Sequence, residues 1–168
     1  MLQITLIRTR MALVVIWLAL AAGVSTRGQS AASIDVVIDE WTVPVGSRPH
    51  DPAVAPDGSI WYTDYARGFL GRLDSRTGEV TEFASPGGRT SRPYGMTSTS
   101  DGAIWFSESG VEPNTVVRFN PSDGSMQSWP IPSGGGIVRH MVTAPNDDVW
   151  LACSGVDRLA RVRRIVPS

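Results

Sequence analysis

The stretch PHDPAVAPDGSIWYTDY, residues 49–65, decides the fold because the chain contains it in three versions. It returns as PYGMTSTSDGAIWFSES at 93–109 and, more loosely, as RHMVTAPNDDVWLACSG at 139–155. The tryptophans of the three copies are 44 and 45 residues apart: Trp61, Trp105 and Trp150. A period of this length, made of short strands, is typical of propeller blades with four antiparallel strands each.

Each copy has the same order of strand and turn signals. An apolar segment comes first, and a tight turn follows, such as Asp57-Gly58 or Asp101-Gly102, which favours a hairpin. The aromatic strand, a third strand and a Gly turn come next, and the first two copies end in a fourth strand. The sequence predicts an all-β propeller of about three blades at these positions: 49–86, 93–132 and 137–167, the last without an outer strand.

Residues 35–44 (DVVIDEWTVP) look like an outer strand with no blade in front of it, with Trp41 matching Phe83 and Trp129 of the two complete copies. Propellers have about four to eight blades, so about three blades form an incomplete ring. The last copy leaves a strand edge open at 157–166, a segment rich in arginine. Unpaired strand edges invite pairing, and we expect self-association between the strand around Trp41 and the strand around Val162 of another molecule.

The first 32 residues have the features of a signal peptide. Arg8 and Arg10 precede an apolar run over residues 11–22, and small and polar residues follow it. The run is too short to span a bilayer comfortably, although a core helix or an uncleaved anchor remains an alternative. We expect an exported protein, periplasmic or extracellular, with no stable membrane span after cleavage.

Charge and cysteine content exclude several classes of function. All 16 acidic residues but only 12 of the 15 basic ones follow position 34, so that this part has a net charge of about −4. A nucleic-acid binder would show a basic face, and none is predicted. Cys153 is the one cysteine, which excludes an intramolecular disulfide and a thiolate zinc cluster. We predict that it is a buried apolar residue.

The repeat resembles the virginiamycin B lyase (streptogramin B lyase) family over roughly residues 36–165. The matching pieces are Pro49-His50, Pro93-Tyr94-Gly95-Met96, Asp57-Gly58, Asp101-Gly102, Ile104-Trp105-Phe106-Ser107-Glu108 and Leu70-Gly71-Arg72-Leu73. The resemblance implies a propeller of seven blades, of which about half is represented here. It also implies a carbon–oxygen lyase that opens a cyclic depsipeptide by elimination, assisted by Mg²⁺.

The resemblance places two histidines and a glutamate around the central channel, the second histidine in a Glu-Pro-His run one blade after the first. His50 matches the first histidine and is the candidate base. Tyr94 holds the equivalent place in the second copy and Arg139 in the third, and both are candidate substrate-binding residues. His140 is a second imidazole one position further on, where strand alternation would turn it to the other face. No Glu-Pro-His run occurs, and the sequence predicts no metal ligands.

Two other repeated features have both a functional and a structural interpretation. Asp64 and Glu108 are equivalent and could form part of a ring around a cation, or hydrogen-bond to backbone at the strand ends, which we favour. The repeat tryptophans could stack on a ligand, but packing between blades explains their equal spacing.

Three functions remain open. The first is the elimination reaction of the lyases. The second is a non-catalytic propeller that binds a small molecule or a peptide on its channel face, which Tyr94 and the lack of Glu-Pro-His favour. The third is a lactone hydrolase of the calcium-dependent propeller type.

Overall fold

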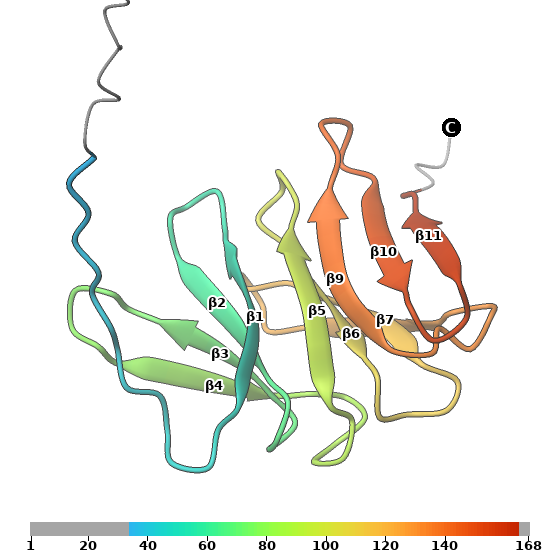
Figure 1. Ribbon diagram of the computed structural model, residues 1–168, viewed down its shortest axis with the longest axis horizontal. Helices are drawn as coiled ribbons and strands as arrows, with labels where there is room; N and C mark the ends of the chain where they lie inside the picture. The colour runs from blue at the N-terminus through green and yellow to red at the C-terminus, as the bar shows by residue number, and fades with distance from the viewer. Residues whose placement is uncertain (1–33, 165–168) are drawn as a thin grey trace, which may run out of the picture. The chain divides into compact units, whose positions relative to one another are not determined.

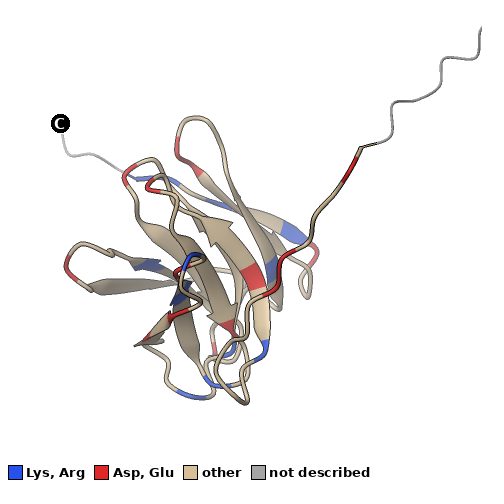
Figure 2. Cartoon of the chain, turned by 90° about the vertical axis from the view of Figure 1, so that its left-hand side faces the viewer, with Lys and Arg blue, Asp and Glu red and all other residues tan. Residues whose placement is uncertain are grey.

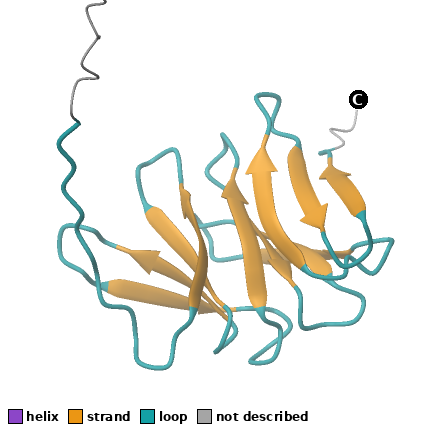
Figure 3. Ribbon diagram, in the orientation of Figure 1, coloured by secondary structure: helices purple, strands orange, loops and turns teal. Residues whose placement is uncertain are grey.

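The computed structural model describes residues 34–164, and strands and loops make up this part of the chain (Figures 1 and 3). The first sheet consists of β1 (Pro49–Val54), β2 (Ile60–Asp64), β3 (Phe69–Leu73) and β4 (Val80–Ala84). The second consists of β5 (Pro93–Ser98), β6 (Ile104–Glu108), β7 (Thr115–Phe119) and β8 (Met126–Pro130). The third consists of β9 (Val138–Thr143), β10 (Val149–Cys153) and β11 (Arg158–Val162).

Neighbouring strands in each sheet are antiparallel and follow chain order, as propeller blades require. The all-β prediction with about three blades is therefore confirmed, including the three-stranded last sheet. The described residues contain no helix that could cross a membrane. The predicted signal peptide, residues 1–32, lies outside the described residues. Within the described residues, 34–38 belong to one compact unit and 39–164 to another, and the sheets all belong to the second.

The first strands of the three sheets, β1, β5 and β9, are neighbours (Figure 1). Each carries a β-bulge near its start, where two residues face one residue of the next strand: residues 50–51, 94–95 and 139–140. A bulge interrupts the alternation of side chains between the two faces of a strand. The side chains of the two bulge residues in each inner strand therefore need not point to opposite faces of the sheet, as they would in a regular strand.

A hydroxyl group opposite the bulge links neighbouring sheets. Thr63 Oγ1 accepts the N–H of Asp51 at 3.2 Å and donates to the carbonyl of Tyr94 in the second sheet at 2.7 Å. Ser107 repeats this arrangement: Gly95 donates to its Oγ at 3.1 Å, and the Oγ donates to the Val138 carbonyl at 3.0 Å. The repeated Thr or Ser before Asp64 and Glu108 therefore has a structural role.

The repeat tryptophans pack toward the following sheet. Trp61 is 1% exposed in a cluster with Phe106 and Phe119 of the second sheet, and Trp105 is 2% exposed in a cluster with residues of the third. The core prediction is thereby confirmed for these two. It is wrong for Trp150, which is 37% exposed because no further sheet follows within the described residues, and the Arg161 guanidinium lies 5.5 Å from its ring. Cys153 is buried, as the sequence predicts.

The predicted outer strand at residues 35–44 does not form, because the structure has no strand there. A strand needs a partner for its backbone N–H and C=O groups, and within residues 34–164 this segment is paired with none of the three sheets. Trp41 nevertheless lies beside the first sheet, and its Nε1 donates to the Ser75 carbonyl in the β3–β4 turn at 3.0 Å.

Arg164, in the arginine-rich segment after β11, forms ion pairs with the two neighbouring sheets. Its guanidinium lies 2.6 Å from Asp101, in the β5–β6 turn of the second sheet, and 3.3 Å from Asp147, in the β9–β10 turn of the third. Arg118 of the second sheet also contacts Asp101, at 2.9 Å. This group of charges ties the two sheets together at the end opposite the bulges.

We expect the stability of the protein to fall as the pH drops from about 4 to about 2, partly through Asp101. Burial alone would raise the pKa of Asp101, but hydrogen bonds from Thr99 and Arg118 and the charge of Arg164 lower it from 3.8 to about 2. A carboxylate with a lowered folded-state pKa stabilises the fold above its unfolded pKa and loses that contribution as it protonates. Asp101→Asn should therefore flatten the acid limb of the stability–pH curve measured by urea unfolding. An unchanged acid limb would contradict this role.

Candidate functional site

A pocket of ≈ 330 Å³ opens where the inner strands β1, β5 and β9 begin. Three predicted site residues, His50, Tyr94 and Arg139, line this inner-strand pocket. Its complete lining is His50, Tyr65, Arg92, Tyr94, Ser109, Ile137 and Arg139. All three sheets contribute, so the pocket exists only where the sheets meet.

Three aromatic rings form one wall of the pocket. The rings of His50 and Tyr94 are 3.8 Å apart between centroids and inclined by 37°. Tyr65 approaches both, at 5.3 Å from His50 and edge-on to Tyr94 at 5.5 Å and 89°. His50 remains exposed to solvent in this cluster. The wall is therefore a partly fixed aromatic surface with an accessible imidazole.

Two guanidinium groups flank this wall. The Cζ of Arg139 lies 5.7 Å from the Tyr94 ring, and its Nη1 donates to the Tyr94 hydroxyl at 3.0 Å. The Cζ of Arg92 lies 5.7 Å from the Tyr65 ring, and Arg92 has a positive φ of 51°. Within residues 34–164 neither guanidinium forms an ion pair with a carboxylate. Both positive charges are therefore available to a ligand.

His140, like Arg139, is exposed, and both residues belong to the bulge of β9. Its Nδ1 lies 3.4 Å from Oδ2 of Asp51 on β1. Gly95 of β5 stands between them, and a Cβ there would come within 3.2 Å of the His140 carbonyl carbon. Asp51 was not predicted from the sequence, where its one signal is the repeat position that it shares with Gly95 and His140.

Asp64 and Glu108 lie below the pocket and have the structural role that the sequence analysis favours. Asp64 is fully buried and accepts hydrogen bonds from the backbone of Arg48 at 3.1 Å and from the Arg67 guanidinium at 2.7 Å. Burial raises the pKa of Asp64, but the hydrogen bonds from Arg48, Ser47 and Arg67 outweigh it and lower the pKa overall.

Glu108 is 2% exposed and holds the loop that crosses from the first sheet to the second. It accepts the backbone N–H of Gly87 at 2.6 Å and the Thr115 hydroxyl at 2.7 Å, as well as the Ser85 hydroxyl. Both carboxylate oxygens of Glu108 thus accept hydrogen bonds from the protein itself. This disfavours the alternative in which Asp64 and Glu108 bind a cation.

The residues around the pocket do not fit the Mg²⁺ that the family resemblance implies. Mg²⁺ and Ca²⁺ are held by oxygen ligands, chiefly carboxylates. The lining of the pocket contains no carboxylate, Asp51 outside it already contacts His140, and Arg92 and Arg139 add positive charge. No cluster of three or more His, Cys, Asp or Glu side chains in residues 34–164 could hold a metal ion.

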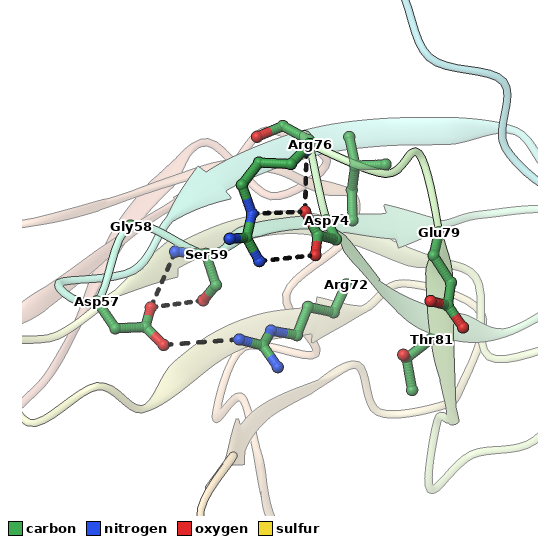
Figure 4. A pocket seen from close by; sticks show the side chains of 10 residues that line it. Asp57, Gly58, Ser59, Arg72, Asp74, Arg76, Glu79 and Thr81 are labelled. Carbon is green, nitrogen blue, oxygen red and sulfur yellow. Dashed lines mark hydrogen bonds and ion pairs between the residues drawn. The ribbon is translucent and has the colours of Figure 1, made fainter.

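A second pocket, of ≈ 460 Å³, lies at the other end of the first sheet (Figure 4). Four of its five charged side chains are engaged with one another, because Arg72 lies 3.8 Å from Asp57 and Arg76 lies 3.3 Å from Asp74, while Glu79 forms no ion pair among the described residues. Asp57 also accepts hydrogen bonds from Ser59 at 2.9 and 2.6 Å. The unpaired charges of the inner-strand pocket make it the better candidate for a functional site.

Comparison with known proteins extends the resemblance. The model of the virginiamycin B lyase family matches residues 16–165. The structure of virginiamycin B lyase from Staphylococcus aureus is 27% identical with a TM-score of 0.67, and the match covers 75% of this chain and 42% of that one. A catalytically inactive form of that enzyme with quinupristin is 27% identical with a TM-score of 0.68, covering 78% and 43%.

A streptogramin B lyase structure, at 24% identity and a TM-score of 0.61, agrees in fold, with 78% of this chain and 46% of that chain covered. The chain thus spans a little over two fifths of the length of these solved lyases, as three blades of a larger ring would. No curated protein matches the sequence.

Proposed function

The chain belongs to the virginiamycin B lyase family, and from that premise we propose that it is an exported propeller protein whose inner-strand pocket binds an organic anion without eliminating it. The observation that carries this proposal is the run Arg92-Pro93-Tyr94. It follows His50 by one blade, where the resemblance places Glu-Pro-His. A guanidinium stands in place of the carboxylate, and a phenol in place of the second imidazole.

This exchange removes the groups that elimination requires. An elimination needs a base for the proton α to the carbonyl and an acid for the leaving oxygen. Arg92 is permanently protonated and accepts no proton. Of the three groups that the resemblance assigns to catalysis, His50 alone has its counterpart in place.

The same exchange creates a site for a carboxylate attached to a flat ring. Guanidinium groups bind carboxylates with two parallel hydrogen bonds, and Arg92 and Arg139 have no competing carboxylate partner among the described residues. The Tyr94 and His50 rings offer a surface on which an aromatic ring can stack. The ligand class that best fits the pocket is therefore an aromatic carboxylate.

Calorimetric titration with 2-naphthoate tests the proposal, with 2-naphthamide as the uncharged control ligand. A hydrogen bond to a charged group contributes about 1.5–3 kcal/mol, so Arg92→Ala and Arg139→Ala should each weaken naphthoate binding about tenfold or more. Arg72→Ala, in the second pocket, is the matched control and should bind as the wild type does. Equal binding of acid and amide, or of all three variants, would contradict the proposal.

A second candidate function is the lyase reaction itself, which the bulges favour. The bulge of β1 contains His50 and Asp51, the bulge of β9 contains His140, and His140 Nδ1 lies 3.4 Å from Asp51 Oδ2, so that two imidazoles and a carboxylate stand on these two inner strands. His50 would take the α proton, the C–O bond would break as the double bond forms, and His140, oriented by Asp51, would protonate the leaving oxygen. Turnover that is lost in both His50→Ala and His140→Ala would establish this alternative.

A further inference from the structure

The outer edge of β11 carries no partner strand within residues 34–164, whereas β4 and β8 cover the corresponding edges of the first two sheets. We propose that residues 37–42 of a second copy of this chain pair with β11 and form the fourth strand of the third sheet. The inference concerns assembly and is independent of the ligand proposed above.

The repeat fixes the register of this pairing. In the second sheet, Phe119 lies opposite Met126, and Val116 lies opposite Trp129. Val162 is the equivalent of Phe119, because it pairs with Val149 as Phe119 pairs with Ile104. Three positions earlier, Leu159 is the equivalent of Val116.

The segment 37–42 matches the fourth strands when Trp41 is aligned with Trp129. Ile38 then takes the place of Met126 and lies opposite Val162, and Trp41 lies opposite Leu159. The first sheet has the same type of pair, Leu70 opposite Phe83. The register therefore brings two apolar pairs together at the edge of the third sheet.

The exposure of these apolar side chains indicates that the edge is incomplete. Leu159 is 75% exposed, whereas its equivalents Leu70 and Val116 are 0% and 4% exposed. Trp41, the proposed partner of Leu159, is 43% exposed. Burial of a leucine against an aromatic ring across two strands stabilises a sheet. The pairing would place Trp41 across from Leu159 as Phe83 lies across from Leu70, and the first sheet of the second copy would then cover Leu159 as the following sheets cover Leu70 and Val116.

An open pocket marks the place of the second apolar pair. It has a volume of ≈ 520 Å³, and its walls include Trp105, Trp129 and Val162. In the second sheet, Met126 packs against the core cluster that contains Phe119. Ile38 of the second copy would occupy the corresponding position beside Val162 and fill this pocket.

Charge complementarity favours the same partner. The proposed register places Asp39 opposite Arg161, where the second sheet has Gln127 opposite Arg118. Oppositely charged residues directly across two strands attract each other. The segment is acidic (Figure 2), with Asp35, Asp39 and Glu40, while β11 and the residues after it contribute Arg158, Arg161, Arg163 and Arg164. Arg161 lies 3.6 Å from Asp148, and Arg164 is paired with Asp101 and Asp147, so the unpaired positive charges of this edge among residues 34–164 are Arg158 and Arg163.

The position of Trp41 explains why the strand comes from a second copy. Its contact with Ser75 holds it beside its own first sheet, while β11 belongs to the third sheet, beyond the second. Fourth strands pack on the following sheet, as Phe83 does on Phe119 at 4.8 Å. Trp41 can therefore keep its own first sheet as neighbour while pairing with the β11 of another molecule. Reciprocal exchange by two copies would give a two-fold assembly in which each copy completes the third sheet of the other.

A disulfide trap tests the register. The chain carrying both Trp41→Cys and Leu159→Cys should form a covalent dimer under mild oxidation, because directly opposed residues bring their Cβ atoms within disulfide range. The native Cys153 is fully buried and can stay. Trp41→Cys with Ala160→Cys is the matched control and should not cross-link, because neighbouring residues of a strand point to opposite faces. Equal cross-linking of the two pairs, or of neither, would overturn the proposal.

Sedimentation of variants without added cysteine provides a second readout. The wild-type chain should sediment as a dimer, and Asp39→Arg should weaken the dimer about tenfold. Arg161→Asp added to Asp39→Arg should restore the dimer, because the ion pair is re-formed with its charges exchanged. A wild-type chain that remains a compact monomer at every concentration, or a double variant no better than the single one, would contradict the pairing.

Discussion

Trp105→Ala is expected to lower the free energy of unfolding by about 3–5 kcal/mol, since it empties the largest side-chain volume between the second and third sheets. Trp105 is 2% exposed and packs in the cluster with Val138 and Leu151. Its Nε1 also donates to the Thr99 hydroxyl at 3.1 Å, and Trp129 stacks on it at 5.8 Å. Urea unfolding followed by circular dichroism measures the loss.

The repeat provides the matched control at the equivalent position. Trp150→Ala removes the same atoms from a side chain that is 37% exposed. In dilute protein, where copies of the chain are separate, this substitution should cost clearly less than Trp105→Ala, about 1 kcal/mol or below. Equal losses for the two variants would mean that the third sheet does not end the packed core.

Gly110→Ala is expected to disrupt the inner-strand pocket and to weaken naphthoate binding about tenfold or more. A Cβ at Gly110 would lie 2.1 Å from the Thr90 carbonyl oxygen and 2.9 Å from Cγ of Arg92. The backbone of residues 90–92 must move to relieve this clash, and Arg92 moves with it. Overpacking of this kind costs about 1–3 kcal/mol of stability as well. Titration and urea unfolding of the same sample separate the two effects.

Gly102→Ala is the control for this second prediction. Gly102 has a φ of +80°, but a Cβ there meets no atom within 4 Å. The substitution should therefore cost about 1–2 kcal/mol through backbone strain and leave naphthoate affinity unchanged. A Gly110→Ala variant with wild-type affinity would show that the position of Arg92 does not matter for binding.

The sequence was sufficient to predict the sheets because their signals are local and repeated. Asp57-Gly58 favours a hairpin turn, and the tryptophan-containing strand that follows it recurs in all three copies at nearly the same spacing. The predictions that were wrong concern segments whose structure depends on contacts with another sheet or strand. Trp150 has the sequence of a core residue but no following sheet within the described residues, and residues 35–44 have the sequence of a strand but no ladder partner.

Only those residues of the candidate site that share one position in the three repeats could be predicted from the sequence. His50, Tyr94 and Arg139 share one position in the three copies, and the structure places them around one pocket. Arg92 and Asp51 could not be assigned to the site in the same way. Arg92 reaches Tyr65 through a loop with positive φ, and Asp51 meets His140 through bulges that no hydrophobic pattern signals.

The most direct test of binding without elimination is incubation of the chain with a streptogramin B-type cyclic depsipeptide and Mg²⁺, followed by mass spectrometry of the products. Binding of 2-naphthoate to the same preparation shows that the pocket is intact. We expect the depsipeptide ring to open no faster with the wild type or with His50→Ala than it does in buffer alone. Ring opening by the wild type that disappears in His50→Ala would contradict this expectation.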